Sequence, residues 1–457
     1  MNARVDVLPV LYRKFLPLVW VAVTIFVDVA SAADPGSLRA GVAKADITPD
    51  PRMLNWTIAS PQPYGSVHDP LFVRALVLSD GQARIAIIVW DLLDARDYAV
   101  ARVRAAITRA TRIPEEHIII SATHNHSGPK SEMGSERTLR REQITSRPVQ
   151  EGPAYREWAD RLVDTCVDLV KKADASLRPV TVSLGRAYVG EWLFNRRPLR
   201  PDQTVVSTLL PKDPYVLGNG LRFGVVDPTL TILSLRGLDG KNLCTLFHVP
   251  MHAVAVYSGY KGVSADWPGR VAGRMSEQLG GEAMFLQGCA GDIVPARRGF
   301  DAVEAMSALI AERAVAADKA STLLATGAIR LSRAQVGLPA TLAAANDLGQ
   351  STIAAEITVL NLGTLALVTL PGEPLQELGT AIRDRSPFPH TIVLGYANGR
   401  GVGYVGLPGG KAKGGYEMSE VGAGTDEAGG FLVETAVRLL REQFAASANG
   451  SEPARGK

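Results

Sequence analysis

One stretch of the sequence limits what this chain can fold into more than any other. Residues 117–120 (HIII) are typical of a buried strand, and the sequence SATHNHSGP at residues 121–129 follows directly. Side chains alternate between the two faces of a strand, so His124 and His126 would project to the same side. The Gly128-Pro129 pair then ends the strand. We therefore expect a strand that delivers two imidazoles to one ion or substrate.

A second apolar run and a helical segment precede this strand. Residues 85–91 (IAIIVWD) predict a strand, residues 95–111 have helical periodicity, and Asp94 is placed to cap that helix. The order of these segments predicts a β-α-β unit with parallel strands, and ligands gather beyond the carboxyl ends of such strands. Because both histidines follow a strand end, the pattern favours a metal or catalytic role over a structural one.

Predicted strands and helices alternate along the rest of the chain. Two apolar runs at residues 230–235 and 243–249 flank Asp239-Gly240, a strong hairpin signal. A content of 46% hydrophobic and 21% charged residues is typical of a globular core. The sequence therefore predicts an α/β fold, with a mixed β-sheet core and flanking helices in a single large catalytic domain. The strand order is left open.

The N-terminus has the features of a secretory signal peptide. Arg13 and Lys14 precede an apolar segment at residues 15–27, and the small residues 30–32 (ASA) occupy the cleavage positions before Ala33. An uncleaved anchor is the alternative, but the apolar run is shorter than the roughly 20 residues that a membrane span needs. We expect a secreted or periplasmic protein. Its predicted parts are a signal peptide (1–32), a hydrolase domain (33–446) and a disordered tail (447–457).

Charge and cysteine content exclude two classes of protein. The net charge of +3 is slight, and no basic stripe with interleaved aromatic residues predicts a nucleic-acid partner. Cys166, Cys244 and Cys289 are too few and too scattered for a disulfide framework. Cys289 could act as a nucleophile, but a small buried residue is the favoured interpretation because the sequence shows no partner base.

Several potential metal ligands or proton carriers follow predicted strands. Three or four imidazole and carboxylate groups would make a catalytic zinc site with one open position. The spacing alone does not identify such a site, because the chain lacks a His-Glu-x-x-His motif. The candidates are His124, His126, His252, Asp266, Asp292 and Glu373.

A series of motifs, running from about Gly41 to about Phe444, resembles the neutral/alkaline non-lysosomal ceramidase family in order and spacing. The THNHSGP and LPGEP segments are the most specific of them. The motifs are THNHSGP (123–129), NRR (195–197), VDP (226–228), His252, SADWPG (264–269), QGCAGDIVP (287–295) and LPGEP (370–374).

That family consists of secreted or surface zinc amidohydrolases that cleave the amide bond of N-acylsphingosine. The resemblance implies that Zn²⁺ is held by His124, His252 and Glu373. A tyrosine of the glycine-rich loop would be the fourth ligand, with Tyr404 preferred and Tyr416 as the alternative.

The resemblance also implies roles for residues around the ion. His126 would contact the metal-bound water or the developing oxyanion, and would donate a proton to the leaving amine. Arg196 would hold the substrate or the tetrahedral intermediate. Asp266 and Asp292 would fix the orientation of the histidines or the loop conformation, or would cap a turn or helix.

Two departures from the family pattern concern specificity. The larger ceramidases carry a serine where this chain has Val294. They also continue into an immunoglobulin-like domain, which we do not expect here because the sequence ends soon after the predicted final helix. We therefore expect the zinc scaffold to be kept, whereas ceramide specificity is less firmly predicted than hydrolase activity.

Three functions follow from the sequence. The first is a zinc-dependent amidase that acts on an N-acyl lipid such as ceramide, or on another amide, with peripheral contact to a membrane surface as an option. The second is a zinc-dependent esterase or other hydrolase with a different substrate. The third is a non-catalytic, zinc-stabilised surface or binding protein. The oligomeric state is not predicted.

Overall fold

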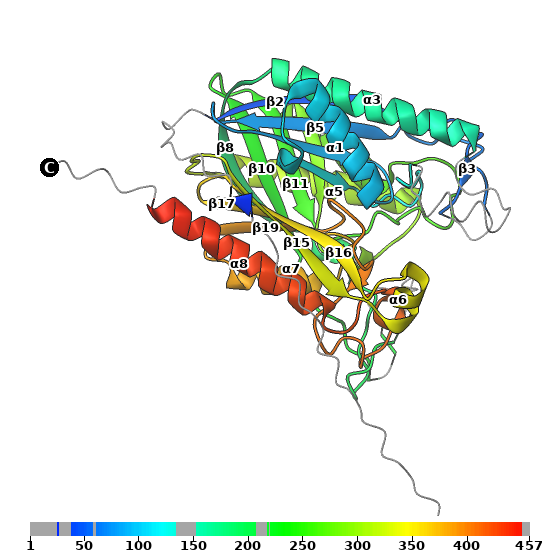
Figure 1. Cartoon of the computed structure of the whole chain (residues 1–457). Helices are drawn as coiled ribbons and strands as arrows, with labels where there is room; N and C mark the ends of the chain where they lie inside the picture. Colours follow the sequence, from blue (N-terminus) through cyan, green and yellow to red (C-terminus); the bar gives the residue numbers. More distant parts are fainter. Residues whose placement is uncertain are drawn as a thin grey trace, which may run out of the picture.

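Two β-sheets lie face to face between layers of helices (Figure 1). The computed structural model describes residues 25–26, 38–57, 61–133, 152–206, 217–218 and 220–449. Apolar side chains from both sheets fill the space between them. The expected α/β fold, with a mixed sheet and flanking helices in one domain, is confirmed. The second sheet, which stacks on the first, was not predicted.

The larger sheet has nine strands in the order β12-β11-β10-β8-β2-β5-β6-β7, with β14 paired to β8. It is mixed, because β6 with β7 and β11 with β12 are parallel pairs. Its strands are β2 (Arg39–Asp46), β5 (Phe72–Ser79), β6 (Arg84–Trp90), β7 (Ile118–Ala122), β8 (Arg178–Tyr188), β10 (Thr229–Gly237), β11 (Asn242–Val249), β12 (Glu282–Gln287) and β14 (Thr322–Leu323).

The smaller sheet has five strands in the order β1-β15-β16-β17-β19. Its strands are β1 (Ile25–Phe26), β15 (Arg330–Pro339), β16 (Thr352–Asn361), β17 (Leu365–Thr369) and β19 (His390–Leu394). Three short pairs complete the strands: β3 (Leu54–Asn55) with β4 (Gln62–Pro63), β9 (Leu193–Asn195) with β13 (Ile293–Pro295), and β18 (Glu373–Pro374) with β20 (Tyr404–Val405).

Helices cover the outer face of each sheet. On the larger sheet, α1 and α3 share a core with β5 to β7, and α4 and α5 share one with β10 to β12. On the smaller sheet, α7 and α8 form the outer layer, and α6 joins β15 to β16 (Figure 1). Their bounds are α1 (Asp97–Thr111), α3 (Pro153–Ala175), α4 (Asp266–Leu279), α5 (Phe300–Lys319), α6 (Leu342–Leu348), α7 (Gln376–Arg385) and α8 (Ala428–Asn449), with short helices η1 (Glu115–His117), η2 (Gly190–Trp192) and the π-helix η3 (Tyr416–Val421).

Strand β5 shows how the sequence produces this layering. Val73, Ala75 and Val77 pack toward the helices, whereas Leu76 and Leu78 pack toward the smaller sheet. Alternation with a period of two supplies an apolar side chain to each face, because both faces of the strand are covered. The continuous apolar run is therefore explained by burial on two sides.

The predicted β-α-β unit is present as β6, α1 and β7, with the two strands parallel. The expected helix cap differs. The residue before α1 is Arg96, which makes no capping bond through its side chain, and Asp94 instead accepts hydrogen bonds from the backbone N–H and hydroxyl of Ser131. The carboxylate therefore ties the helix entry to a neighbouring loop.

The predicted ends of the chain lie mostly outside the described residues. Within the predicted signal peptide only Ile25–Phe26 is described, as β1 against β15. Helix α8 continues to Asn449, past the predicted start of the tail at residue 447. No described helix combines the length and apolar character that crossing a membrane requires.

Candidate metal centre

Three histidines meet where strands of the larger sheet end. The ring nitrogens that His124, His126 and His252 could offer to a metal all lie within 4.8 Å of one another. His124 and His126 follow β7, and His252 follows β11. An isolated parallel bridge between Asn125 and Ala253 holds the two segments together. The predicted meeting of the first two histidines is thus found, with the third beside them.

The backbone brings His124 and His126 together in an unexpected way. They lie beyond the end of β7, and His124 has a φ of 61°, in the left-handed region. Strand alternation is therefore not the reason that both rings point to one place. A turn that few non-glycine residues adopt orients the first imidazole, and such strain is often found at functional sites.

Backbone carbonyl groups fix two of the three imidazoles. His124 Nδ1 lies 2.7 Å from the carbonyl oxygen of Leu93, and His252 Nδ1 lies 2.5 Å from that of Ala290. Since a carbonyl can only accept, each Nδ1 carries the hydrogen and each Nε2 presents a lone pair. Histidine ligands of metals are commonly oriented by such bonds.

Glu373 adds a carboxylate to the two oriented imidazoles. Its Oε2 atom lies 3.2 Å from His124 Nε2 and 3.5 Å from His252 Nε2. Among the described residues, neither His252 Nε2 nor Glu373 Oε2 has a hydrogen-bond partner of good geometry, although both atoms are buried. Buried polar atoms rarely go unpaired. A metal ion would satisfy both, so the residues fit a metal.

The charge state of these groups suits metal binding. Burial, together with the charge of Arg196, lowers the pKa of His252 to about 3, so its imidazole is neutral. Burial by itself would raise the pKa of Glu373, but His124 and His252 together hold it well below its usual value. A neutral imidazole and an ionised carboxylate are the forms that coordinate a cation.

His126 differs from the other two histidines. Its Nε2 lies 3.1 Å from His124 Nε2, and its ring has no other hydrogen-bond partner within the described part of the chain. Burial, and then His124, lowers the pKa of His126 well below the usual value. The centroid of its ring also lies 4.9 Å from the centroid of the Tyr257 ring. Without a carbonyl anchor, this imidazole is the one suited to exchanging a proton.

Tyr404 is brought to the site by a short ladder. Glu373 in β18 and Tyr404 in β20 are direct partners in a parallel pair. Burial, and then the Glu373 carboxylate, raises the pKa of Tyr404 well above its usual value. The ring of Tyr416, the alternative ligand, lies 5.9 Å from that of Tyr404. Of the two tyrosines, Tyr404 is the direct neighbour of Glu373.

The side chain of Arg196 also contacts Tyr404. Its Nη2 donates to the Tyr404 hydroxyl at 3.0 Å and to the Gly291 carbonyl at 2.8 Å. Its Nε lies 2.7 Å from Glu417, a carboxylate with 1% exposure that also pairs with Arg197 at 3.0 Å. Burial alone would lower the pKa of Arg196, but Tyr404 and Glu417 raise it. The guanidinium therefore stays charged.

The two aspartates predicted to support the site hold loops. Asp292 accepts hydrogen bonds from the side chain of Asn195 and the backbone N–H of Gln376, both at 2.9 Å. Asp266 accepts from the backbone N–H groups of Ala255 and Val256, just after His252. Within the described part of the chain, neither carboxylate has a hydrogen bond or ion pair with a histidine, and the bonds they do accept hold the loops that carry Arg196 and His252.

Sequence reasoning missed several residues that the fold brings to the site. The ring centroids of Tyr396 and His124 lie 4.2 Å apart. The buried hydroxyl of Tyr396 has no hydrogen-bond partner among the described residues. Tyr257 lines a cavity of about 460 Å³ formed by residues 255–260 and 298–300. These tyrosines and Glu417 carry no local motif, and only tertiary contacts identify them.

Two residues singled out in the sequence analysis have no chemical role in this geometry. Cys289 is buried, and burial raises the pKa of its thiol, which disfavours the reactive thiolate. Val294 is also buried, in the short strand β13, where it pairs with Phe194. It offers the site no hydroxyl.

Known proteins resemble this chain at the level of sequence and of fold. Residues 38–330 match the family described as neutral/alkaline non-lysosomal ceramidase, N-terminal. The chain is 23% identical over 296 residues to the neutral ceramidase of Pseudomonas aeruginosa, covering 62% of this chain and 40% of that protein. It therefore spans less than half the length of this curated relative.

Two solved structures share the fold. A crystal structure of neutral ceramidase from Pseudomonas aeruginosa superposes with a TM-score of 0.66 at 19% identity, covering 90% of this chain and 75% of that one. A structure described as ceramidase complexed with C2 gives 0.66 at 18% identity, covering 90% and 76%. The family match includes His124, His126, Arg196 and His252 and spans more than half of the chain. The chain belongs to the neutral/alkaline non-lysosomal ceramidase family.

Proposed function

We propose that this protein is a zinc-dependent hydrolase that cleaves the amide bond of a ceramide-like N-acyl lipid. The observation that carries the proposal is the pair of buried atoms His252 Nε2 and Glu373 Oε2, which lie 3.5 Å apart beside His124 and have no hydrogen-bond partner of good geometry among the described residues. Family membership supports the choice of bond and substrate, since the similar protein of Pseudomonas aeruginosa is a neutral ceramidase.

The donor set favours zinc. His124, His252, Glu373 and Tyr404 would hold the ion through nitrogen and oxygen atoms, which are ligands that zinc accepts in catalytic sites. When bound, zinc would polarise the amide carbonyl and lower the pKa of water. Donors from both sheets converge there, because His124 and His252 follow strands of the larger sheet and Glu373 follows β17 of the smaller one.

Arg196 and His126 supply the remaining chemistry. The Arg196 guanidinium, held by Glu417 and Gly291, donates to the Tyr404 hydroxyl beside Glu373. A fixed cation at this place would stabilise negative charge that develops on the carbonyl oxygen. His126, whose ring has no carbonyl anchor, would carry a proton to the leaving amine.

The surroundings of His126 support a substrate with an apolar part. Tyr257, whose ring packs against His126, also lines the neighbouring cavity of about 460 Å³. This cavity could receive an acyl or alkyl chain, since binding sites for such groups are concave and mostly apolar. The signal-peptide features at residues 1–32 support a further proposal, that the enzyme acts outside the cytoplasm.

Metal content measured together with activity tests the proposal. The wild-type protein, His124→Ala and Glu373→Ala are purified, bound zinc is quantified, and fatty-acid release from ceramide is assayed. His248→Ala is the control, because His248 is a partly buried histidine within strand β11 and lies outside the cluster. We expect near-stoichiometric zinc and ceramide cleavage in the wild type and the control, and loss of both in the two ligand variants.

Two results would contradict the proposal in different ways. Absence of zinc from the wild-type protein would refute the metal-dependent mechanism. Zinc without ceramide cleavage would refute the substrate and retain the metal centre, and a panel of other amides and esters would then identify the bond.

A further inference from the structure

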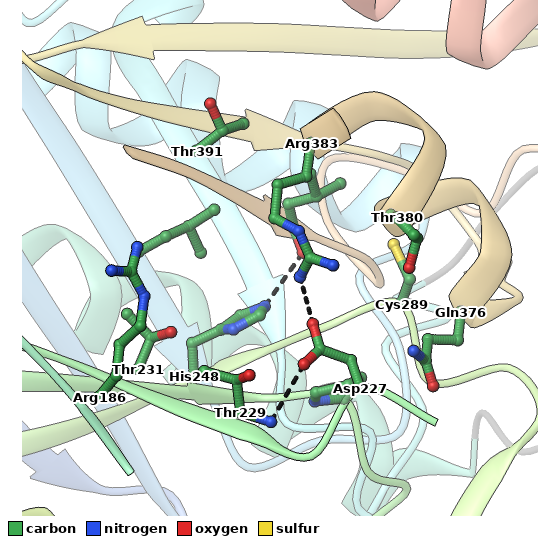
Figure 2. Close-up of a pocket in the computed structure, with 14 residues that line it drawn as sticks. Arg186, Asp227, Thr229, Thr231, His248, Cys289, Gln376, Thr380, Arg383 and Thr391 are labelled. Atoms are coloured by element: carbon green, nitrogen blue, oxygen red, sulfur yellow. Dashed lines mark hydrogen bonds and ion pairs between the residues drawn. The ribbon is translucent and has the colours of Figure 1, made fainter. Parts of the chain in front are cut away.

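A second cavity, of about 300 Å³, has charged and hydroxylated side chains in its walls (Figure 2). Its walls come from strands β8, β10 and β11 of the larger sheet, from strand β19 of the smaller sheet, and from helix α7. None of the expected metal ligands lines it. The side chains that matter to the argument are Arg186, Thr229, His248, Gln376, Thr380 and Arg383.

Gln376 is the first indication that a ligand belongs there. Its side chain lines the cavity with only 3% of the residue exposed, and neither its amide oxygen nor its amide nitrogen has a hydrogen-bond partner in the described part of the chain. Leaving a buried polar group without a hydrogen-bond partner destabilises the folded state. Because its backbone N–H is bonded to Asp292, the residue is held in place at the first turn of α7.

The charged groups indicate the sign of the ligand. Arg186 and Arg383 both line the cavity and are exposed. Arg383 is paired with Asp227, whereas the hydrogen-bonding partner of Arg186 is the imidazole of His390 at 3.4 Å. Two guanidinium groups and one carboxylate leave a net positive charge, since burial lowers the pKa of His248 and keeps that ring neutral. The cavity would therefore attract an anion.

The remaining polar groups indicate what else the ligand carries. Thr229 and Thr380, which carry hydroxyl groups, also line the walls (Figure 2). Thr391 lines the cavity as well, but its hydroxyl donates to Ser386 at 2.7 Å. A threonine hydroxyl can both donate and accept, and so can a glutamine amide. These polar groups are complementary to hydroxyl groups, and the apolar side chains of Pro250, Ile392 and Val393 leave room for a short carbon backbone between them.

We propose that this cavity is a second binding site, which takes a small hydroxylated anion whose acidic group is a carboxylate or a phosphate. The acidic group would lie between Arg186 and Arg383, and hydroxyl groups would bond to Gln376 and the threonines. The site shares one loop with the metal centre: Cys289 lines the cavity, and the next residue, Ala290, holds His252 through its carbonyl.

Calorimetric titration of the full chain, as purified, tests the proposal. Glycerate and glycerol phosphate are the two probes, and they distinguish a carboxylate from a phosphate as the preferred acidic group. We expect saturable binding of one molecule of at least one probe. Gln376→Leu and Thr380→Val should each weaken it about tenfold or more, because each removes polar atoms from the lining without adding charge.

A matched pair of arginines on α7 provides the control. Arg383→Gln removes a lining charge and leaves Asp227 unpaired, so binding should be lost. Arg385→Gln changes an exposed arginine of the same helix that pairs with Glu434 and does not line the cavity, so binding should stay within twofold of wild type. Circular dichroism confirms that each variant is folded.

Three results would overturn the second site. They are no saturable binding of either probe to the wild type, unchanged binding by the folded Gln376→Leu and Thr380→Val variants, and equal loss in Arg383→Gln and Arg385→Gln. Because the variants change residues of this cavity and none of the expected metal ligands, and no activity is measured, these outcomes do not depend on the proposed hydrolase function.

Discussion

Glu373 and Tyr404 are directly paired across a two-residue parallel ladder, although helix α7 and strand β19 separate them in the sequence. The pairing places a phenol next to the carboxylate that faces His124 and His252. Backbone hydrogen bonds, rather than a flexible loop, therefore set the distance between the two expected oxygen ligands.

Tyr404→Phe should weaken zinc binding about tenfold or more, because it removes the hydroxyl beside Glu373. Tyr416→Phe is the control, since it leaves the ladder partner of Glu373 intact. The measurement is zinc affinity by competition with a chromogenic chelator. A larger loss in Tyr416→Phe would reassign the fourth ligand to Tyr416.

Zinc should stabilise the folded protein by mass action. At a free concentration 100 times the dissociation constant, a ligand that binds only the native state adds about 2.7 kcal/mol to the free energy of unfolding. We expect zinc to raise the melting temperature of metal-free wild-type protein and of His248→Ala, and to leave that of His252→Ala unchanged. Equal shifts in all three proteins would place the zinc elsewhere.

Arg196→Lys should lower kcat by about 100-fold or more while bound zinc is retained, because a lysine cannot hold Glu417 and reach Tyr404 with the same fork of donors. Arg197→Lys is the matched control, since Arg197 shares Glu417 but donates to the Gly414 carbonyl instead of Tyr404. Steady-state kinetics on ceramide measure both. If both variants lost kcat to a similar extent, the effect would come from the shared contacts with Glu417 and not from the contact between Arg196 and Tyr404.

Glu417→Gln should destabilise the fold by about 3–5 kcal/mol, because it leaves two buried guanidinium groups without their shared carboxylate. Glu304→Gln is the control, since Glu304 also pairs with two arginines, Arg270 and Arg274, but is half exposed. Glu304→Gln should lower the free energy of unfolding by about 1 kcal/mol or less. Urea denaturation gives both values, and equal losses would contradict the role of burial.

Asp266 should make stability depend on pH between about 4 and 6. Burial raises the pKa of Asp266 from 3.8 to about 6, and the N–H groups of Val256, Trp267 and Ala255 offset this only partly. The folded state then binds more protons than the unfolded state in this window, so stability falls as the pH rises through it.

Asp266→Asn isolates this effect, because asparagine does not titrate. The stability of wild type relative to the variant should decline by up to about 3 kcal/mol from pH 4 to pH 6.5. Urea denaturation at several pH values measures the decline. A relative stability that is constant with pH, or that increases, would contradict the raised pKa.

Local pattern predicted the elements near the site well. The β6-α1-β7 unit and the β10–β11 hairpin follow from periodicity and turn residues, and each is present. The same local signals placed His124, His252 and Glu373 at strand ends. The structure brings the three side chains together at those ends.

Features that depend on distant contacts were not predictable in the same way. Nothing near Glu417 indicates that its carboxylate would pair with two arginines more than 200 residues earlier in the chain. The orientation of His124 depends on a left-handed backbone, which no histidine sequence pattern signals. The stacking of the two sheets likewise arises from apolar faces that look alike in sequence.

The expected ligands belong to two different parts of the fold: His124 and His252 follow strands of the larger sheet, while Glu373 and Tyr404 belong to the segments around the smaller one. An ion bound by all four would act as a cross-link between the sheets. Loss of the metal would then reduce the cooperativity with which the two sheets unfold. The metal-free chain would exchange the amide hydrogens of its two sheets at separate rates, and the metal-bound chain would exchange them together.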